Sequence, residues 1–466
     1  MINTNLNSLP IMKKPFTATL LSILALFILT GCSKKPLAPA PTPTISTPTV
    51  TTTSASAISR NEATLGGAIS ANGGVSITAI GICYNTSPSP TIANTTIAGT
   101  AGVESFLVAV NNLTPNTKYY VRAYATNSAG TAYGNEINFT TNPITTPTVT
   151  TGKIVTTTTP FATTTSGQCT DDGGSAIIAR GMCWSSAHVP TIVDSKTADG
   201  AGIGNFNSSI TGLKGNTTYY LRAYASNSIG TMYGDTVTIA TDVEGNVYNS
   251  VKIGTQTWML ENLKVSKYND GESIPYVTDP LQWDNGFVLT TPQFCWYNND
   301  INNKNIYGGI YNWLTVSSGK LAPPGWHVPS HSEFGVLIKY LDPATTYKQS
   351  LGDTANAFMY YGSSVAGGLL KEQGLTHWLS PNTGATNQSG FTAFGGGERS
   401  NFSTFGLLAG HDYYLGFFGG WWSSTNFIPG HSQGLSFRLL LDSNDSTIND
   451  SPDGTANGYS VRCIKD

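Results

Sequence analysis

Alternation of hydrophobic and polar residues dominates the first half of the chain and predicts short β-strands. Residues 119–124 (YYVRAY) alternate as expected of a strand with one buried face. Clusters of Gly, Asn and Asp separate such segments, which is typical of β-sandwiches. The pattern also repeats, because residues 117–134 (TKYYVRAYATNSAGTAYG) and 217–234 (TTYYLRAYASNSIGTMYG) lie 100 positions apart. An offset of this size indicates a duplicated domain rather than a solenoid of short repeats.

Both copies resemble fibronectin type III domains. The spacing L-x-P-x-T-x-Y opens strand F in that family, and its tyrosine hydroxyl bonds the backbone in a tyrosine corner. The first copy has this spacing at Leu113, Pro115, Thr117 and Tyr119. The second copy keeps Leu213, Thr217 and Tyr219, with Gly215 in place of the proline. We therefore expect two all-β, Ig-like sandwiches, at residues 47–142 and 146–242, that act as a spacer.

A different pattern begins near residue 243, beyond which eight of the nine tryptophans lie. Residues 247–263 predict a pair of strands around Gly254, and residues 307–316 (YGGIYNWLTV) predict a helix. A second helix is predicted over residues 331–341, which place apolar side chains on one face at Phe334, Leu337, Ile338 and Leu341. Residues 243–466 are numerous enough to bury a core of their own, so we expect a third domain.

Seven separated motifs identify this third domain by resemblance. They are VKIGTQTWMLENL, CWYNND, YGGIYNW, GKLAPPGWHVPSHSEF, SPNTGATNQSGFTAFGGG, WWSST and GYSVRCIKD, in this order. Together they resemble the Fibrobacter succinogenes major paralogous domain (FISUMP) of Bacteroidetes and Fibrobacteres lipoproteins. The resemblance implies an extracytoplasmic location and an α+β fold akin to C-type lectin or formylglycine-generating-enzyme domains. It implies no established activity. Ala322 occupies a position where the family usually has cysteine.

The N-terminus predicts export and lipid attachment. Lys13 and Lys14 precede the apolar run LLSILALFIL, which is too short to span a membrane and is followed by LTGC at residues 29–32. This tetrapeptide resembles the bacterial lipobox, which implies that residues 1–31 are a signal peptide and that Cys32 carries the lipid. The alternative is an ordinary secretion signal with a chance cysteine. Residues 32–46 predict an extended Pro/Thr-rich tether.

Composition excludes some function classes. Only 11% of the 466 residues are charged and the formal net charge is -3, with no basic stripe of the kind that nucleic-acid binders carry. Ser33, rather than Asp, follows the predicted lipidation site, which favours the outer membrane. Whether the protein faces the periplasm or the cell surface stays open.

The segment PPGWHVPSHSEF (residues 323–334) combines His327, His331 and Glu333, which invites a zinc or acid–base interpretation. Pro329 argues against it, since a residue before proline is pushed out of helical geometry and the two histidines then do not share a helix face. Ser330 and Glu333 instead fit a capping box at the start of the predicted helix. Capping is the favoured hypothesis, and His327 remains a weak ligand candidate.

The cysteines offer two possible disulfides. Cys169 and Cys183 flank a DDGG turn, and they are interpreted either as a bridge in an oxidising envelope or as two buried thiols. Cys295 and Cys463 are the cysteines of the third domain. A structural bridge between them is favoured over catalysis, because no histidine is fixed nearby by a motif.

Other ligand candidates are weaker. The calcium motifs of C-type lectins (EPN or QPD with WND) are absent, but an acidic run offers oxygen ligands at Asp442, Asp445, Asp450 and Asp453. A solvated hairpin loop is the favoured interpretation of this run. Trp421 and Trp422 are candidates for an aromatic sugar platform, although adjacent strand residues face opposite sides.

The sequence therefore predicts a non-enzymatic, lipid-anchored envelope protein. Its lectin-like domain would contact a carbohydrate or an envelope protein from a β-sandwich stalk. No cofactor is expected, although calcium stays possible, and no nucleic-acid partner is expected. The alternatives are an enzyme with an unrecognised activity in the FISUMP domain and a purely structural envelope component.

Overall fold

The computed structural model describes residues 44–100, 103–156, 159–283, 291–345, 347–349, 359–400, 412–426 and 435–466. The predicted signal peptide, Cys32 and most of the tether lie outside these residues. Contacts divide the described chain into two compact units. One contains residues 44–55, 64–109 and 120–138, and the other contains residues 56–63, 110–119 and 139–466. No described helix is long and apolar enough to cross a membrane.

The first repeat folds into two antiparallel sheets. One sheet has the order β1-β2-β5, with strands β1 (Thr49–Ser56), β2 (Ala63–Ala71) and β5 (Ser105–Val110). The other has the order β4-β3-β6-β7, and β8 also pairs with β6. Its strands are β4 (Thr95–Ala98), β3 (Ala79–Asn85), β6 (Lys118–Asn127), β7 (Gly130–Tyr133) and β8 (Ile137–Thr140). Leu65, Ile82 and Val121 are fully buried, so strands from both sheets contribute to the interior.

The second repeat has the same layout. A three-stranded sheet has the order β13-β10-β9, with β9 (Thr148–Thr156), β10 (Thr163–Asp171) and β13 (Gly204–Ile210). The facing sheet begins β12-β11-β14-β16, with β15 paired to β14. These strands are β11 (Ala179–Ser185), β12 (Ser195–Lys196), β14 (Thr217–Ser226), β15 (Thr231–Tyr233) and β16 (Val237–Thr241). One core joins side chains of both sheets, among them Val149, Phe206, Met182 and Leu221.

The predicted tyrosine corner is present in both repeats. The Tyr119 hydroxyl accepts the Thr114 amide at 2.9 Å. The Tyr219 hydroxyl accepts the Lys214 amide at 2.8 Å, although Gly215 replaces the proline of the first copy. The prediction of two fibronectin type III-like sandwiches is therefore confirmed.

The C-terminal domain is built from three sheets. The long sheet of the second sandwich continues as β17-β18-β30-β21, and the other two orders are β19-β20-β29-β24-β25 and β22-β23-β28-β27-β26. The strands of the long sheet are β17 (Val247–Ile253), β18 (Gln256–Met259), β21 (Trp326–His327) and β30 (Ile464–Lys465). The second sheet contains β19 (Phe294–Trp296), β20 (Gly309–Asn312), β24 (Glu398–Arg399), β25 (Asp412–Tyr413) and β29 (Gly458–Tyr459). The third contains β22 (Tyr347–Gln349), β23 (Met359–Ser363), β26 (Phe418–Asn426), β27 (Leu435–Asp442) and β28 (Ile448–Gly454).

Short helices complete the domain. They are α1 (Pro280–Trp283), α2 (Lys304–Tyr307), α3 (Trp313–Ser317), α4 (His331–Leu341) and α5 (Ala366–Leu370), with 3-10 turns η1 (Tyr297–Asn299) and η2 (Ile301–Asn303). The predicted strand pair around Gly254 and the helix at residues 331–341 are confirmed by β17, β18 and α4. The helix predicted over residues 307–316 is wrong in its first half. There β20 pairs with β19 and β29, and α3 begins only at Trp313, after the N-cap Asn312.

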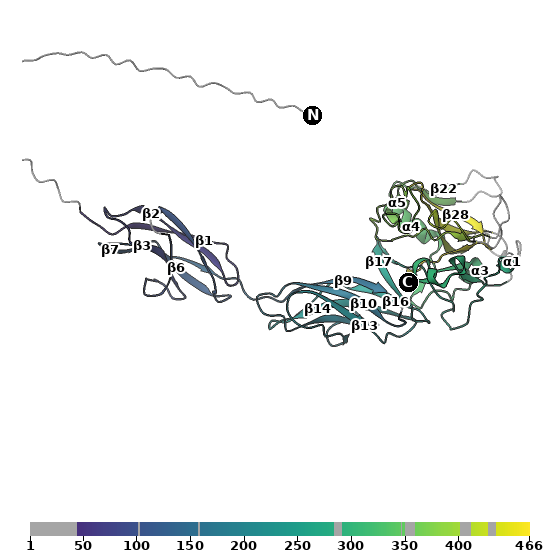
Figure 1. The fold of residues 1–466 in the computed structure, drawn as a ribbon, viewed down its shortest axis with the longest axis horizontal. Coiled ribbons are helices and arrows are strands. Elements are labelled where there is room, and N and C mark those ends of the chain that lie inside the picture. Colours follow the sequence, from purple (N-terminus) through teal and green to yellow (C-terminus); the bar gives the residue numbers. More distant parts are fainter. Residues whose placement is uncertain are drawn as a thin grey trace, which may run out of the picture. The chain divides into compact units, whose positions relative to one another are not determined.

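A shared sheet joins the second sandwich to the C-terminal domain. β16 pairs with β17 through Ile239–Asn249, Ala240–Tyr248 and Thr241–Val247, and Figure 1 shows the two strands side by side. Successive strand residues face opposite sides. Accordingly, Ile239 and Val247 lie in the sandwich core, while Ala240 and Tyr248 lie in the core of the next domain. The two strands form one wall of each core.

Asp242 closes the turn between these strands. It is buried, with 2% of its surface exposed. Its Oδ1 accepts the amides of Glu244 and Asn246, both at 2.9 Å. Its Oδ2 accepts Asn246 Nδ2 and the Tyr248 hydroxyl, both at 2.7 Å. Burial raises the pKa of Asp242, and these hydrogen bonds oppose the rise. The predicted boundary at residues 242 and 243 therefore falls inside a tight turn rather than in a linker.

The shared wall predicts that residues 243–466 are less stable alone than within residues 146–466. Separation removes β16, the four hydrogen bonds of the Asp242 carboxylate and further side-chain hydrogen bonds. Three of these further bonds join Trp326 Nε1 to Thr218 Oγ1, Lys465 Nζ to the Tyr220 hydroxyl, and Asn216 Nδ2 to the Asn269 carbonyl. Roughly 3 kcal/mol of unfolding free energy is expected to be lost from these three bonds alone. Urea unfolding of the two fragments measures the difference, and equal midpoints and slopes would contradict the shared wall.

Candidate functional site

The segment PPGWHVPSHSEF lies where β21 leads into α4. Trp326 and His327 pair with Lys465 and Ile464 of β30, which fixes the strand before the helix. Ser330 is the N-cap, in an extended conformation, and α4 begins at His331. His327 therefore precedes the helix, as the position of Pro329 predicts.

The predicted capping box is present. The Ser330 hydroxyl oxygen accepts the Glu333 amide at 3.3 Å. In return, Glu333 Oε2 accepts the Ser330 amide at 2.8 Å and the Ser330 hydroxyl at 2.8 Å. Together these bonds satisfy two backbone amides at the helix start, where no earlier carbonyl is available.

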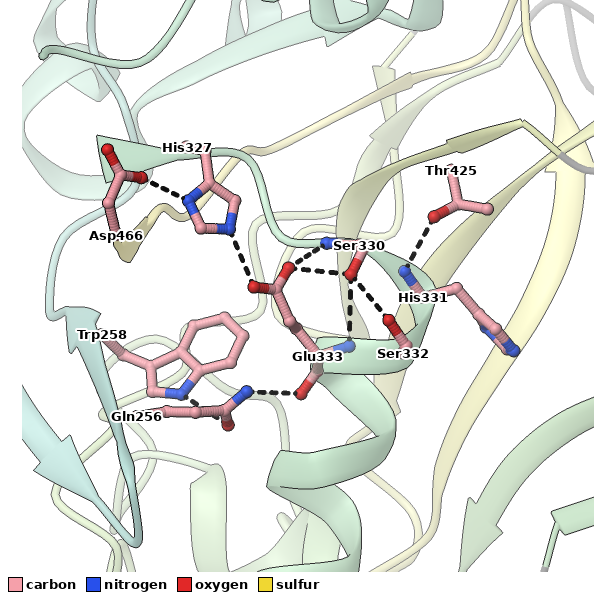
Figure 2. Close-up of polar contacts among 9 residues, drawn as sticks. All are labelled: Gln256, Trp258, His327, Ser330, His331, Ser332, Glu333, Thr425 and Asp466. Atoms are coloured by element: carbon pink, nitrogen blue, oxygen red, sulfur yellow. Dashed lines mark hydrogen bonds and ion pairs between the residues drawn. The ribbon is translucent and has the colours of Figure 1, made fainter. Parts of the chain in front are cut away.

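His327 adds two carboxylate contacts that the sequence did not reveal. Figure 2 shows its ring between Asp466 and Glu333. Nδ1 lies 2.6 Å from Asp466 Oδ1, and Nε2 lies 2.8 Å from Glu333 Oε1. Burial alone lowers the pKa of His327, but the two carboxylates raise it by more, so the pKa lies above its ordinary value. Burial raises the pKa of Glu333, but the bonds from Ser330 and His327 lower it by more.

His331 belongs to a different cluster, and its side chain points away from His327 in Figure 2. Its Nδ1 lies 2.5 Å from Asp450 Oδ2, and its ring stacks on Phe437 with centroids 3.9 Å apart. Asp450 is fully buried, and burial raises its pKa to about 6 against the opposing contact with His331. The two histidines therefore do not converge on one ligand. Within the described residues, no group of three or more His, Cys, Asp or Glu side chains is placed to hold a metal ion.

The four aspartates proposed as calcium ligands are dispersed. They lie on or between β27 and β28, which form the predicted hairpin. Asp450 contacts His331, and Asp453 contacts Arg438 at 2.5 Å. The carbonyl oxygens of Asp442 and Asp445 accept hydrogen bonds from Lys371 Nζ, both at 2.7 Å, and the Thr383 carbonyl accepts a third at 3.0 Å. A fully buried ammonium group thus binds the backbone carbonyls of two of these aspartates.

A second polar cluster was missed by sequence reasoning. The Tyr459 hydroxyl lies 2.5 Å from both Glu398 Oε2 and Asp453 Oδ2. Arg438 Nε donates to the same Asp453 oxygen. Burial raises the pKa of Glu398, and the bond from Tyr459 opposes the rise. Two carboxylates in unlike environments are the arrangement that acid–base catalysis uses. In the sequence, the only sign of this cluster is that Arg438 and Asp453 are charged residues within the segments that form β27 and β28. Charged residues in strands are too common to mark a functional site.

The predicted aromatic platform is wrong. Trp421 and Trp422 are 1% and 0% exposed. Their indole nitrogens donate to Asn262 Oδ1 and the Tyr311 carbonyl, both at 2.8 Å. Adjacent residues of β26 do face opposite sides, but both sides are covered, since Trp421 and Trp422 lie in different cores.

Neither predicted disulfide is formed. Cys169 lies on β10 and Cys183 on β11, which belong to facing sheets, and both are free buried thiols. Burial raises the pKa of Cys183 to about 11. Cys463 is a free thiol in the core around Trp422, whereas Cys295 lies in a separate cluster around Trp283. Burial in separate places explains why the second pair does not meet.

Comparisons with known proteins identify the C-terminal domain. A family model described as the Fibrobacter succinogenes major domain matches residues 251–465. No curated protein matches the chain.

Solved structures with similarity to parts of the chain include the sensor domain of the anti-sigma factor RsgI4 from Pseudobacteroides cellulosolvens. It has 17% identity, covers 21% of this chain and 98% of its own, and gives a TM-score of 0.17. The chicken CNTN1 FN1–FN3 domains have 14% identity, cover 42% of this chain and 68% of their own, and give a TM-score of 0.18. The fibronectin type III domain of human fibronectin type III domain containing protein 3 has 21% identity, covers 23% of this chain and 94% of its own, and gives a TM-score of 0.16. At these TM-scores the likenesses add nothing to the fold.

The two carboxylates around His327 predict a pH-dependent contribution to stability. Because its pKa is raised above 6.5 on folding, the contribution is complete below that value and is lost as the pH rises through the folded pKa. His327→Gln is expected to cost about 0.5–1 kcal/mol at acidic pH, the range for a solvent-screened pair, and less at alkaline pH. Urea unfolding between about pH 5.5 and 8.5 measures this trend.

Ser330→Ala is the matched control. It removes the capping hydroxyl beside the same carboxylate and is expected to cost about 1 kcal/mol. Glu333 stays ionised across this pH range, since its pKa is lowered, so this cost is expected not to change. Parallel pH profiles for the two variants would contradict the role given to His327.

Proposed function

We propose that the protein, whose residues 251–465 match the family model of the Fibrobacter succinogenes major domain, is a lipid-anchored protein of the bacterial outer membrane. In this proposal it has no catalytic activity. The C-terminal domain, with a C-type-lectin-like role, binds carbohydrate at the end of a stalk made of two sandwiches. The proposal does not specify whether the protein faces the periplasm or the cell surface.

The observation that carries the proposal is the sheet shared by the second sandwich and the C-terminal domain. The β16–β17 pairing and the buried Asp242 turn join the two as neighbours with a common wall. A domain fixed in this way is held in one orientation on its support, which suits display of a binding surface. The lipobox-like residues 29–32 and the Pro/Thr-rich tether support attachment to a membrane.

The ionisable groups of the C-terminal domain support a binding role over catalysis. His327, His331 and Lys371 each contact acceptors of the same domain. Their roles in capping, core packing and loop closure account for their positions. The Glu398 and Asp453 pair is the specific observation that favours the alternative, an enzyme, and the binding experiment below is designed to reveal it.

Lipid attachment is expected at Cys32. The full-length chain should incorporate a radiolabelled fatty acid and sediment with membranes when expressed in a bacterium that processes lipoproteins. Cys32→Ser should lose both the label and the sedimentation, because acylation requires the thiol. Cys83→Ser is the control and should keep both, since Cys83 is buried in the first sandwich. Membrane association of Cys32→Ser without label would refute the anchor.

Carbohydrate binding is expected on a glycan array probed with the full-length protein in detergent. Selective binding without change in the mass of the bound glycans is the expected result. Chelation of calcium should leave the signal unchanged, because the carboxylates of Asp450 and Asp453 already contact His331 and Arg438. A change in glycan mass would favour an enzyme, with Glu398→Gln as the first variant to examine. If no glycan is bound, the remaining hypotheses are that the domain binds a protein or has a structural role.

A further inference from the structure

A cleft opens where β17 leaves β16, and we call it the junction cleft. Only Val247–Asn249 of β17 pair with β16, whereas Ser250–Ile253 pair with β18. The β16–β17 ladder therefore ends at Asn249, beyond which the Ser250 hydroxyl still donates to the Thr238 carbonyl at 2.7 Å. The resulting space has a volume of about 520 Å³ and is bounded by β9, β16, β17 and the loop of residues 387–392. This volume lies within the range of small-molecule sites, which are frequent where domains meet.

Asn249 presents a fixed hydrogen-bond acceptor at this cleft. Its side-chain Nδ2 donates to Glu261 Oε1 at 2.7 Å and to the Ile154 carbonyl at 3.3 Å. Its backbone amide donates to Glu261 Oε2, also at 2.7 Å. Turning the amide over would set its oxygen against two acceptors, so these contacts determine its orientation. The remaining oxygen, Oδ1, is buried and has no hydrogen-bond partner in the protein.

An unsatisfied buried acceptor is costly, at about 1–3 kcal/mol, and therefore favours any donor that reaches it. Asn249 is among the residues that line the cleft, and its Oδ1 lies just behind the cleft surface. A donor in the cleft would reach this oxygen after a small movement of the cleft wall. Glu261 acts here as a positioning residue, because it holds Asn249 without lining the cleft itself.

The other lining residues select the chemistry of the ligand. Apolar side chains (Val237, Val251 and Leu260) alternate with hydroxyl groups (Thr238 and Ser250) around the space. Lys153 is the one charged side chain of the lining, and no carboxylate belongs to it. Such a surface offers no charge compensation for a cationic ligand, and only one positive charge for an anionic ligand. It suits a molecule that combines hydroxyl donors with apolar C–H faces.

We propose that the junction cleft binds a neutral saccharide, with Asn249 Oδ1 accepting one of its hydroxyl groups. This assignment rests on the proposed carbohydrate-binding function and adds the location and the ligand class. The second sandwich then contributes to the binding site, because β9 and β16 form part of the cleft wall.

The test uses the full-length protein on an array of neutral oligosaccharides and matched uronic-acid-containing ones. Binding is expected on neutral members. Asn249→Leu keeps the size of the side chain but removes the acceptor together with the donors to Glu261 and Ile154, and its affinity should fall about tenfold. Thr238→Trp places a bulky side chain at the cleft wall and should abolish binding.

Asn207→Leu is the matched control. It makes the same substitution at an exposed position of β13, outside the cleft lining, and should leave affinity unchanged. Thermal unfolding checks that every variant is folded. Wild-type affinity in a folded Thr238→Trp variant would overturn the cleft assignment while leaving carbohydrate binding in place. Binding restricted to the uronic-acid glycans would overturn the neutral ligand class, and no glycan binding by the wild type would overturn both proposals.

Discussion

The pairing of β16 with β17 is the interaction on which the rest of the structure depends. Alternate residues of these two strands serve two cores, because Ile239 and Val247 face the sandwich while Ala240 and Tyr248 face the next domain. The pairing in turn requires the tight turn closed by Asp242, whose carboxylate accepts four hydrogen bonds. A one-residue shift in register would exchange the two faces. The buried carboxylate therefore fixes both the register and the assignment of side chains to cores.

The same geometry explains where the junction cleft lies. β17 lies between β16 and β18, and it pairs with β16 only at Val247–Asn249 and with β18 only from Ser250 onward. Asn249 is the last residue on the β16 side of this exchange. Its contacts with Glu261 and with Ile154 of β9 compensate for the end of the ladder, but they satisfy only its donors. The orphaned oxygen follows from the way in which the two domains are joined.

Local features were predictable from the sequence, whereas contacts between distant residues were not. The tyrosine corners, the α4 stripe and the Ser330–Glu333 capping box depend on spacings of a few residues, which a single sequence displays. The helix predicted at residues 307–316 failed because β20 obtains its partners from residues 294–296 and 458–459. Trp421 and Trp422 were misread because the sequence shows alternation but not that both faces of β26 are covered. The His327–Asp466 and Asp450–His331 contacts span more than a hundred residues and leave no local pattern.

Several buried charged groups of the C-terminal domain have their partners within the same domain, and this affects how a ligand is recognised. Lys371 binds three carbonyl oxygens, Asp450 meets His331, and Asp453 meets Arg438. Buried charges require such partners, since an isolated one is strongly unfavourable. These groups are consequently committed to stabilising loops and strand contacts. Apart from Lys153, the junction cleft contains neutral donors and acceptors with apolar walls, so discrimination there comes mainly from the positions of hydroxyl groups and from shape. Such recognition tolerates changes in salt and pH that would disturb a site based on ion pairs.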